Sequence, residues 1–200
     1  MPTVVTLYSG GKDSALAACL LDPFYDVTLC RCTFGIEPLP GPIREGATAL
    51  GFSIESVTLD RSVAETAIDR MVADGYPRDG IQLVHEHALE TVAGLDRDHD
   101  AVADGTRRDD RAPTVDRPTA QSLEDRHGIA YLQPLAGYGR AAIDELAGRK
   151  LSVETGPTER LATGDYETEL RSLMAAEHGR STVEDVFPEH TQSRVLGPKP

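Results

Sequence analysis

Apolar and polar residues alternate along the chain in blocks whose lengths fit strands and helices in turn. Short apolar runs at residues 3–8, 26–33, 53–59, 100–104 and 129–132 have the length of buried strands. Longer segments between them carry apolar residues at helical spacing. Because parallel strands need a crossover connection, this order predicts a parallel sheet with helices on both faces.

The helical segments repeat their apolar positions every three or four residues. We predict helices over residues 13–21, 43–50, 62–73, 81–93, 118–127, 140–149 and 166–178. A last strand is predicted at residues 150–153, whereas residues 155–164 and the tail after Gly179 look like loops. We expect one domain, with a core over residues 1–150 and a carboxyl-terminal appendage and tail over residues 151–200.

Composition limits the class of protein. Hydrophobic residues make up 40% of the 200 residues, which is enough for a core. No apolar run has the length of a membrane span and no signal peptide precedes the first strand, so we expect a cytoplasmic protein without a membrane partner. Three cysteines are too few and too unevenly placed for a disulfide framework.

The formal net charge is −13, and only three of the basic residues are lysines. An acidic surface repels nucleic acid in ordinary salt. The same composition suits a cytoplasm of very high salt, where repulsion between charges is screened. We favour this halophilic interpretation, which leaves the charge as only weak evidence against an RNA substrate.

The densest polar signal follows the first predicted strand. Residues 9–14 read Ser-Gly-Gly-Lys-Asp-Ser and lead directly into a predicted helix. Glycines let the backbone bring its N–H groups against a ligand, and the helix start adds free amides and the positive end of the helix dipole. This junction predicts a phosphate-binding site. Its expected donors are Ser9, Gly10, Gly11, Lys12 and Ser14.

A second polar turn, residues 105–111, follows the fourth predicted strand. Ligands of open parallel sheets bind at the carboxyl ends of the strands, where the strand order reverses, so we expect this turn to face the first one. Its arginines can neutralise phosphate and its aspartates can hold Mg²⁺. The candidate residues are Gly105, Thr106, Arg107, Arg108, Asp109 and Asp110.

The first turn resembles the S-G-G-x-D-[ST] signature of the PP-loop ATP pyrophosphatases, also called the adenine nucleotide alpha hydrolase-like family. Residues 104–110 are similar to the family's G-T-x-x-x-D segment, and residues 134–147 to its P-L-x-x-x-x-[RK]-x-E-[IV] stretch. Ala142 replaces an acidic residue of that stretch, and Asp144 and Glu145 are the candidates for its role. Together the matches cover most of the predicted core.

The resemblance implies an α/β fold with an open, mostly parallel five-stranded sheet, doubly wound and Rossmann-like (HUP type). It also implies cleavage of ATP to AMP and pyrophosphate, with ATP and Mg²⁺ as cofactors. The implied catalytic residues are Lys12, Asp13, Asp109 and Asp110, of which the three aspartates are the implied metal ligands. By the same resemblance, the end of the second strand, near Thr33 and Phe34, lines the adenine pocket.

The acceptor is not fixed by these motifs. No cysteine follows Cys32, which separates the chain from sulfonucleotide reductases and deazaguanine-nitrile synthases, and there is no room for a glutaminase domain. We expect an adenylating enzyme that activates a carbonyl, amide or carboxylate oxygen of a tRNA base or a small metabolite. Nitrogen or sulfur from a separate donor would then attack. The alternative is a nucleotide-binding sensor or partner protein without turnover.

Cys30 and Cys32 alternate onto one face of a strand. A functional thiol pair is one interpretation, but we favour small buried strand residues.

Other polar residues allow either a structural or a functional interpretation. His85 and His87 point to different sides of a helix, which disfavours a shared metal ion, and we interpret them as a surface pair. Residues 164–167 and 190–194 either close over the acceptor, or cap a helix and form a disordered end.

Overall fold

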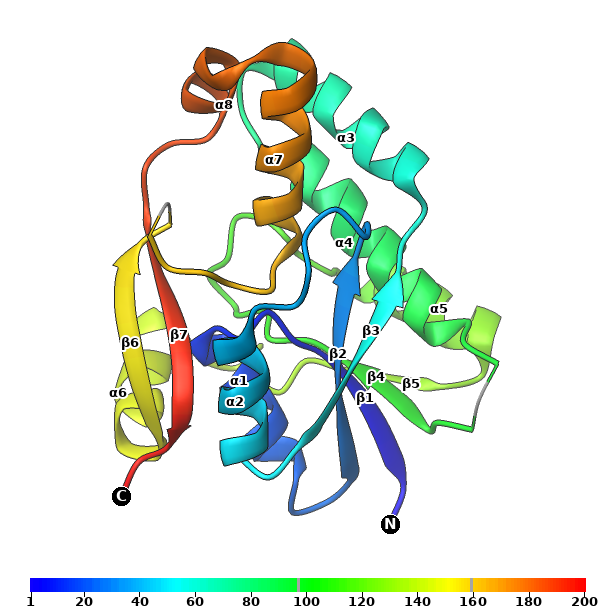
Figure 1. Ribbon diagram of the computed structural model, residues 1–200. Helices are drawn as coiled ribbons and strands as arrows, with labels where there is room; N and C mark the ends of the chain where they lie inside the picture. Colours follow the sequence, from blue (N-terminus) through cyan, green and yellow to red (C-terminus); the bar gives the residue numbers. More distant parts are fainter. Residues whose placement is uncertain (97, 159) are drawn as a thin grey trace.

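A parallel five-stranded sheet forms the centre of the computed structural model, which describes residues 1–200 except 97 and 159 (Figure 1). Across the sheet the order is β3 (Ser53–Thr58), β2 (Asp26–Thr33), β1 (Thr3–Leu7), β4 (Ala101–Ala103) and β5 (Ala130–Leu132). All four pairings are parallel. The strand order reverses between β1 and β4, which confirms the predicted open α/β fold.

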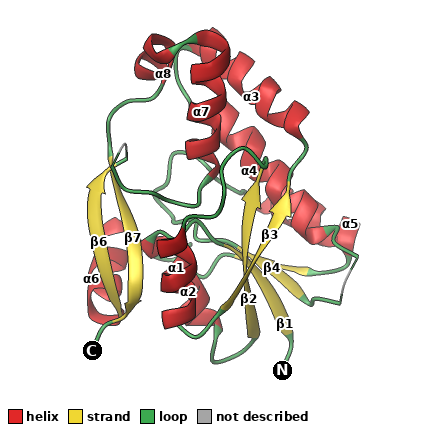
Figure 2. Ribbon diagram, viewed as in Figure 1, coloured by secondary structure: helices red, strands yellow, loops and turns green. Residues whose placement is uncertain are grey.

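Helices cover both faces of this sheet (Figure 2). Buried residues of α1 (Lys12–Leu21), α2 (Gly41–Ala49) and α6 (Arg140–Lys150) form one apolar cluster. Buried residues of the other helices form a second cluster on the opposite face. Those helices are α3 (Arg61–Asp74), α4 (Arg78–Ala93), α5 (Arg117–His127), α7 (Tyr166–His178) and α8 (Arg180–Val186).

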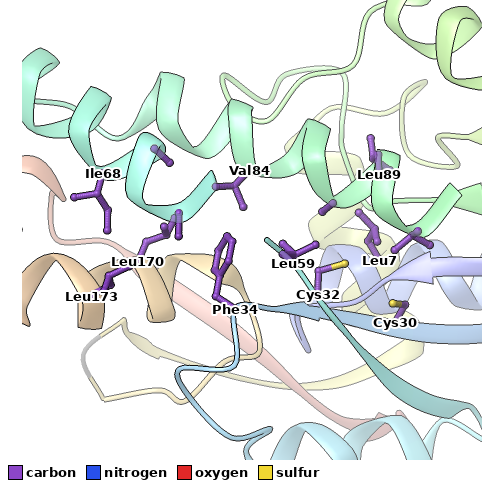
Figure 3. Close-up of a cluster of buried hydrophobic side chains, with 14 of the residues drawn as sticks. Leu7, Cys30, Cys32, Phe34, Leu59, Ile68, Val84, Leu89, Leu170 and Leu173 are labelled. Carbon is purple, nitrogen blue, oxygen red and sulfur yellow. The ribbon is translucent and has the colours of Figure 1, made fainter. Parts of the chain in front are cut away.

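Strand β2 shows how alternation divides the two clusters. Val27 and Leu29 belong to the α1 side, and Cys30 and Cys32 to the α4 side, as the period of two requires. Figure 3 shows both cysteines among the apolar side chains of that second cluster, and both are buried. Their predicted burial in the strand is confirmed.

Local signals fix the helix ends where the sequence carries them. Asp60 and Asp116 accept backbone N–H groups of the first turns of α3 and α5, as aspartates do at N-caps. Gly75 and Gly128 end these helices in the left-handed conformation that glycine adopts without strain.

The expectation of a loop-like tail was wrong. After α7 the chain forms α8 and then β7 (Thr191–Pro198), which pairs antiparallel with β6 (Leu151–Pro157). β7 carries few apolar residues, so its sequence lacks the alternation that marks a strand. Part of the segment predicted as a loop, residues 155–157, belongs to β6, and Glu159 of that segment lies outside the described residues.

No helix in the part of the chain that the structure describes is both long enough and apolar enough to cross a membrane.

Candidate functional site

The turn after β1 is held in a tight conformation by its own hydroxyls. Gly10 has φ +83°, and a Cβ there would lie 2.4 Å from Cδ1 of Ile43, so only glycine fits. The Gly11 N–H donates to Ser9 Oγ at 3.3 Å, and Ser14 Oγ donates to the Gly11 carbonyl at 3.2 Å. The loop therefore leads directly into the first turn of α1.

Lys12 begins α1 and lies between two carboxylates. Its Nζ is 2.8 Å from Asp13 Oδ1 and 3.2 Å from Asp144 Oδ1. Glu145 instead pairs with Arg149 on the exposed side of α6. Of the two acidic residues that could replace the missing one at Ala142, the structure brings Asp144 to the loop.

The two predicted turns face each other, as the sequence predicts. A Cβ on Gly105 would lie 2.7 Å from the backbone nitrogen of Ser14, so the two backbones are in direct contact. Arg107 Nη1 lies 3.5 Å from Asp13 Oδ2. Residues 9–14 and 105–111 thus form opposite walls of one site at the reversal of strand order.

Arg107 is the centre of the second turn. Its Nε lies 3.0 Å from Asp110 Oδ1 and 3.9 Å from Asp109 Oδ1. Partial burial opposes the charge, but the hydrogen bond to Asp110 and the nearby carboxylates of Asp13 and Asp109 outweigh it and raise the pKa of Arg107. Arg108 is exposed and its guanidinium lies beside Gly139, at the start of α6.

The three aspartates proposed as metal ligands contact cations and amides instead of one another. Asp13 contacts Lys12 and Arg107, and Asp109 accepts the Arg140 N–H at 2.9 Å. Among the described residues no group of three His, Cys, Asp or Glu side chains could hold a metal ion. These residues do not form a metal centre on their own.

Two adjoining cavities of about 270 Å³ each open at this site. One is polar and is lined by the loop, Lys12, Arg107 and Ser193. The other is largely apolar, and its walls include Cys30, Cys32 and Ile81. They share four lining residues, so one ligand with a charged and an apolar end can occupy both. The shared residues are Ser9, Asp13, Ser14 and Asp165.

His85 is buried, which contradicts its interpretation as a surface residue. Its Nε2 lies 2.8 Å from Asp104 Oδ2 and its Nδ1 lies 2.7 Å from the Tyr166 hydroxyl. A carboxylate accepts hydrogen bonds only, so Nε2 carries a proton and donates to Asp104, while Nδ1 shares a hydrogen bond with the Tyr166 hydroxyl. Spacing on the helix separated His85 from His87 correctly, but it could not show which side of α4 faces the sheet.

Asp104 receives further donors from Tyr131 and Thr106. Burial alone would raise the pKa of Asp104, but the hydrogen bonds from His85 and Thr106 outweigh it, so the pKa lies below its usual range. Burial and the neighbouring carboxylate raise the pKa of Tyr131. Burial also raises the pKa of Tyr166. The network therefore holds an ionised carboxylate beside neutral phenols at the wall of the apolar cavity.

Thr33 and Phe34 do not line either cavity. Thr33 Oγ1 and the Phe34 N–H donate to the carboxylate of Glu169 on α7, at 2.7 and 2.8 Å. The Phe34 ring lies in the apolar core, among the side chains labelled in Figure 3. On the same strand, Cys30 and Cys32 line the apolar cavity instead.

Several cavity residues come from the last third of the chain, in the two polar segments for which the sequence left both interpretations open. Asp165 caps α7 by accepting the Thr168 N–H at 3.0 Å, and it also lines both cavities. Gln192 and Ser193 on β7 line the polar cavity. Residues 164–167 thus cap a helix and also line the site. The polar character of these two segments was the available signal, but no local sequence pattern showed that they lie beside residues 9–14.

Comparison with known proteins gives relatives over nearly the whole chain. A family model described as a family of unknown function, DUF7411, matches residues 1–197. "Uncharacterized protein MJ0690" of Methanocaldococcus jannaschii is 40% identical over 197 residues, which cover 98% of this chain and 96% of the relative.

A solved structure is similar over the same length. It is described as the crystal structure of a predicted subunit of tRNA methyltransferase from Methanocaldococcus jannaschii. It superposes with a TM-score of 0.88 at 39% identity, covering 100% of this chain and 99% of the other. Together with the family match, this likeness shows that the chain belongs to the DUF7411 family.

Proposed function

We propose that this protein is an ATP-dependent adenylating enzyme of the PP-loop type, which cleaves ATP to AMP and pyrophosphate. The observation that carries the proposal is the polar cavity, lined by Lys12 and Arg107, that opens into an apolar cavity of similar size. A nucleoside triphosphate has the matching shape, a strongly charged tail joined to a largely apolar base.

The positions of the charges suit cleavage between the α- and β-phosphates. Negative charge grows on the departing pyrophosphate as this bond breaks. Lys12 Nζ and the Arg107 guanidinium both lie at the polar cavity, where they would stabilise that charge. Mg²⁺ bound with ATP would be held by the phosphates and by one or two carboxylates, for which Asp13 and Asp110 line the cavities.

The proposed acceptor is an oxygen of a tRNA base, which attacks the α-phosphate and releases pyrophosphate. A nitrogen or sulfur nucleophile from a separate donor then displaces AMP. The description of the solved relative as a predicted subunit of a tRNA methyltransferase supports tRNA over a small metabolite. It also supports a second protein as the partner that completes the modification.

The experiment uses tRNA from cells that lack this protein, since that tRNA lacks the product of the reaction. Incubation with the protein and labelled MgATP is expected to release AMP and pyrophosphate. Already modified tRNA from normal cells is the control and should give little release. ATP binding without pyrophosphate release, with tRNA and with small-metabolite extracts alike, would instead establish the nucleotide-binding sensor or partner.

Lys12→Ala should slow pyrophosphate release roughly 100-fold or more, because it removes a charge that stabilises the transition state. ATP affinity, measured by titration calorimetry, should fall much less. Lys150→Ala is the matched control, since Lys150 lies at the exposed end of α6. Equal loss of binding and turnover in Lys12→Ala would mean that Lys12 only holds the nucleotide.

A further inference from the structure

We propose that Ser193 is a phosphate-positioning residue, supplied to the loop by the last strand of the chain. This inference rests on the proposed function, because it assigns a further donor to the same cradle. Ser193 Oγ accepts the N–H of Lys12 at 3.1 Å. The two residues are 181 positions apart in the sequence. Ser193 also lines the polar cavity together with Lys12 and Arg107.

The strand that carries Ser193 is firmly placed. Val195 is buried, and its N–H donates to the Gly10 carbonyl at 2.9 Å. A Cβ on Gly46 of α2 would lie 2.3 Å from the Val195 carbonyl oxygen, so strand and helix are in backbone contact. Such close packing holds Ser193 at the loop without help from a ligand.

The same carboxyl-terminal region binds the carbonyl groups of the loop. The Gly164 N–H donates to the Ser9 carbonyl at 2.7 Å, as Val195 does to Gly10. These two bonds tie the backbone of the loop to the carboxyl-terminal region.

A serine hydroxyl can accept one hydrogen bond and donate another. Ser193 Oγ accepts from Lys12, and within the described residues it donates no hydrogen bond of its own. The hydroxyl can therefore donate to a phosphate oxygen while it stays bonded to the loop. There is a competing role. In it, Ser193 Oγ occupies in the free protein the position that a phosphate oxygen takes on binding, so the ligand must displace it.

Titration calorimetry with inorganic pyrophosphate separates these roles by the direction in which Ser193→Ala changes the binding affinity. Ser193→Ala should bind pyrophosphate roughly tenfold more weakly, the usual effect of losing a hydrogen bond to a charged group. Ser193→Thr keeps the hydroxyl and should bind as the wild type does. Ser181→Ala is the matched control, since Ser181 is an exposed serine of α8 that lines neither cavity.

Equal or tighter binding by Ser193→Ala, with an unchanged thermal midpoint, would overturn the role of Ser193 and leave the proposed function standing. Failure of the wild type to bind pyrophosphate would overturn both.

Discussion

Asp104 at the end of β4 illustrates how one buried carboxylate organises the site. Its oxygens accept from His85 on α4, Tyr131 on β5 and Thr106 in the following turn. These donors come from three different elements, so the carboxylate ties them together at the apolar cavity. A carboxylate that is buried and fully hydrogen-bonded is costly to disturb, because its neighbours lose their partner without access to water.

Replacement of this residue gives a prediction with a defined pH dependence. Asp104→Asn should lower the free energy of unfolding at pH 7 by about 3 kcal/mol. The pKa of Asp104 is lowered on folding. Its stabilisation is therefore fully present above the unfolded value of about 4 and is lost as the pH falls through the lower folded value.

Urea unfolding of wild type and Asp104→Asn between pH 2 and 7 measures this difference. The difference in free energy of unfolding between the two proteins should be largest at neutral pH and should decrease below about pH 4. Asp74→Asn, at an exposed position of α3, is the control and should leave stability nearly unchanged. A gap that stays constant down to pH 2 would contradict the assignment of an ionised, stabilising carboxylate.

Single residues of the site were predictable where local sequence carries the whole signal. Gly10 and Gly105 could be predicted because a turn between a buried strand and a helix demands glycine for close backbone approach. Arg107 followed from its place after β4. The buried state of His85 could not be predicted, since helical spacing gives relative directions around α4 and not the direction of the sheet.

At the scale of elements, α7 holds the segment that follows β2. Glu169 has no exposed surface, and its carboxylate accepts the N–H groups of Phe34, Ile36 and Glu37 in addition to the Thr33 hydroxyl. Arg31 Nη2 lies 3.7 Å from Oε1 of the same carboxylate. One side chain thus satisfies the backbone donors of a loop that has no regular structure.

Glu169→Gln should destabilise the protein by about 2–4 kcal/mol, because an amide nitrogen would face backbone donors and Arg31 would lose its charge partner. Amide hydrogen exchange should show the largest gain at residues 34–37. Glu177→Gln, an exposed change on the same helix, should have little effect on either measurement. Uniform acceleration of exchange across the sheet would argue against a local role for Glu169.

The elements also differ in how far they could be predicted. The parallel sheet and the helices up to α7 follow from periodicity, since each of their strands is an apolar run. β7 does not, because its polar residues face a loop and a cavity, and its hydrogen-bond partners are far away in sequence. The signal for this strand lies in tertiary contacts that no local window contains.

For the molecule as a whole, net charge governs the response to salt. With a formal charge of −13, repulsion between surface carboxylates opposes the compact state, and added salt screens that repulsion. The thermal midpoint should therefore rise between 0.1 and 2 M KCl.

A triple variant tests the electrostatic origin of this rise. Asp69→Asn, Asp74→Asn and Glu177→Gln together remove three negative charges from exposed positions. The variant should show a higher midpoint at low salt and a smaller increase with KCl, measured by calorimetry. An equal increase in both proteins would assign the effect to the preferential exclusion of salt instead.

The bond between Ser193 and Lys12 has a consequence for biosynthesis. During translation at about 5–20 residues per second, the 181 positions between them separate the emergence of the loop from that of its completing strand by about 10–40 s. On the ribosome the nascent amino-terminal half would carry an unfinished anion pocket through that interval. Under the proposed function, nucleotide binding would reach its full strength only after the terminal hairpin has docked.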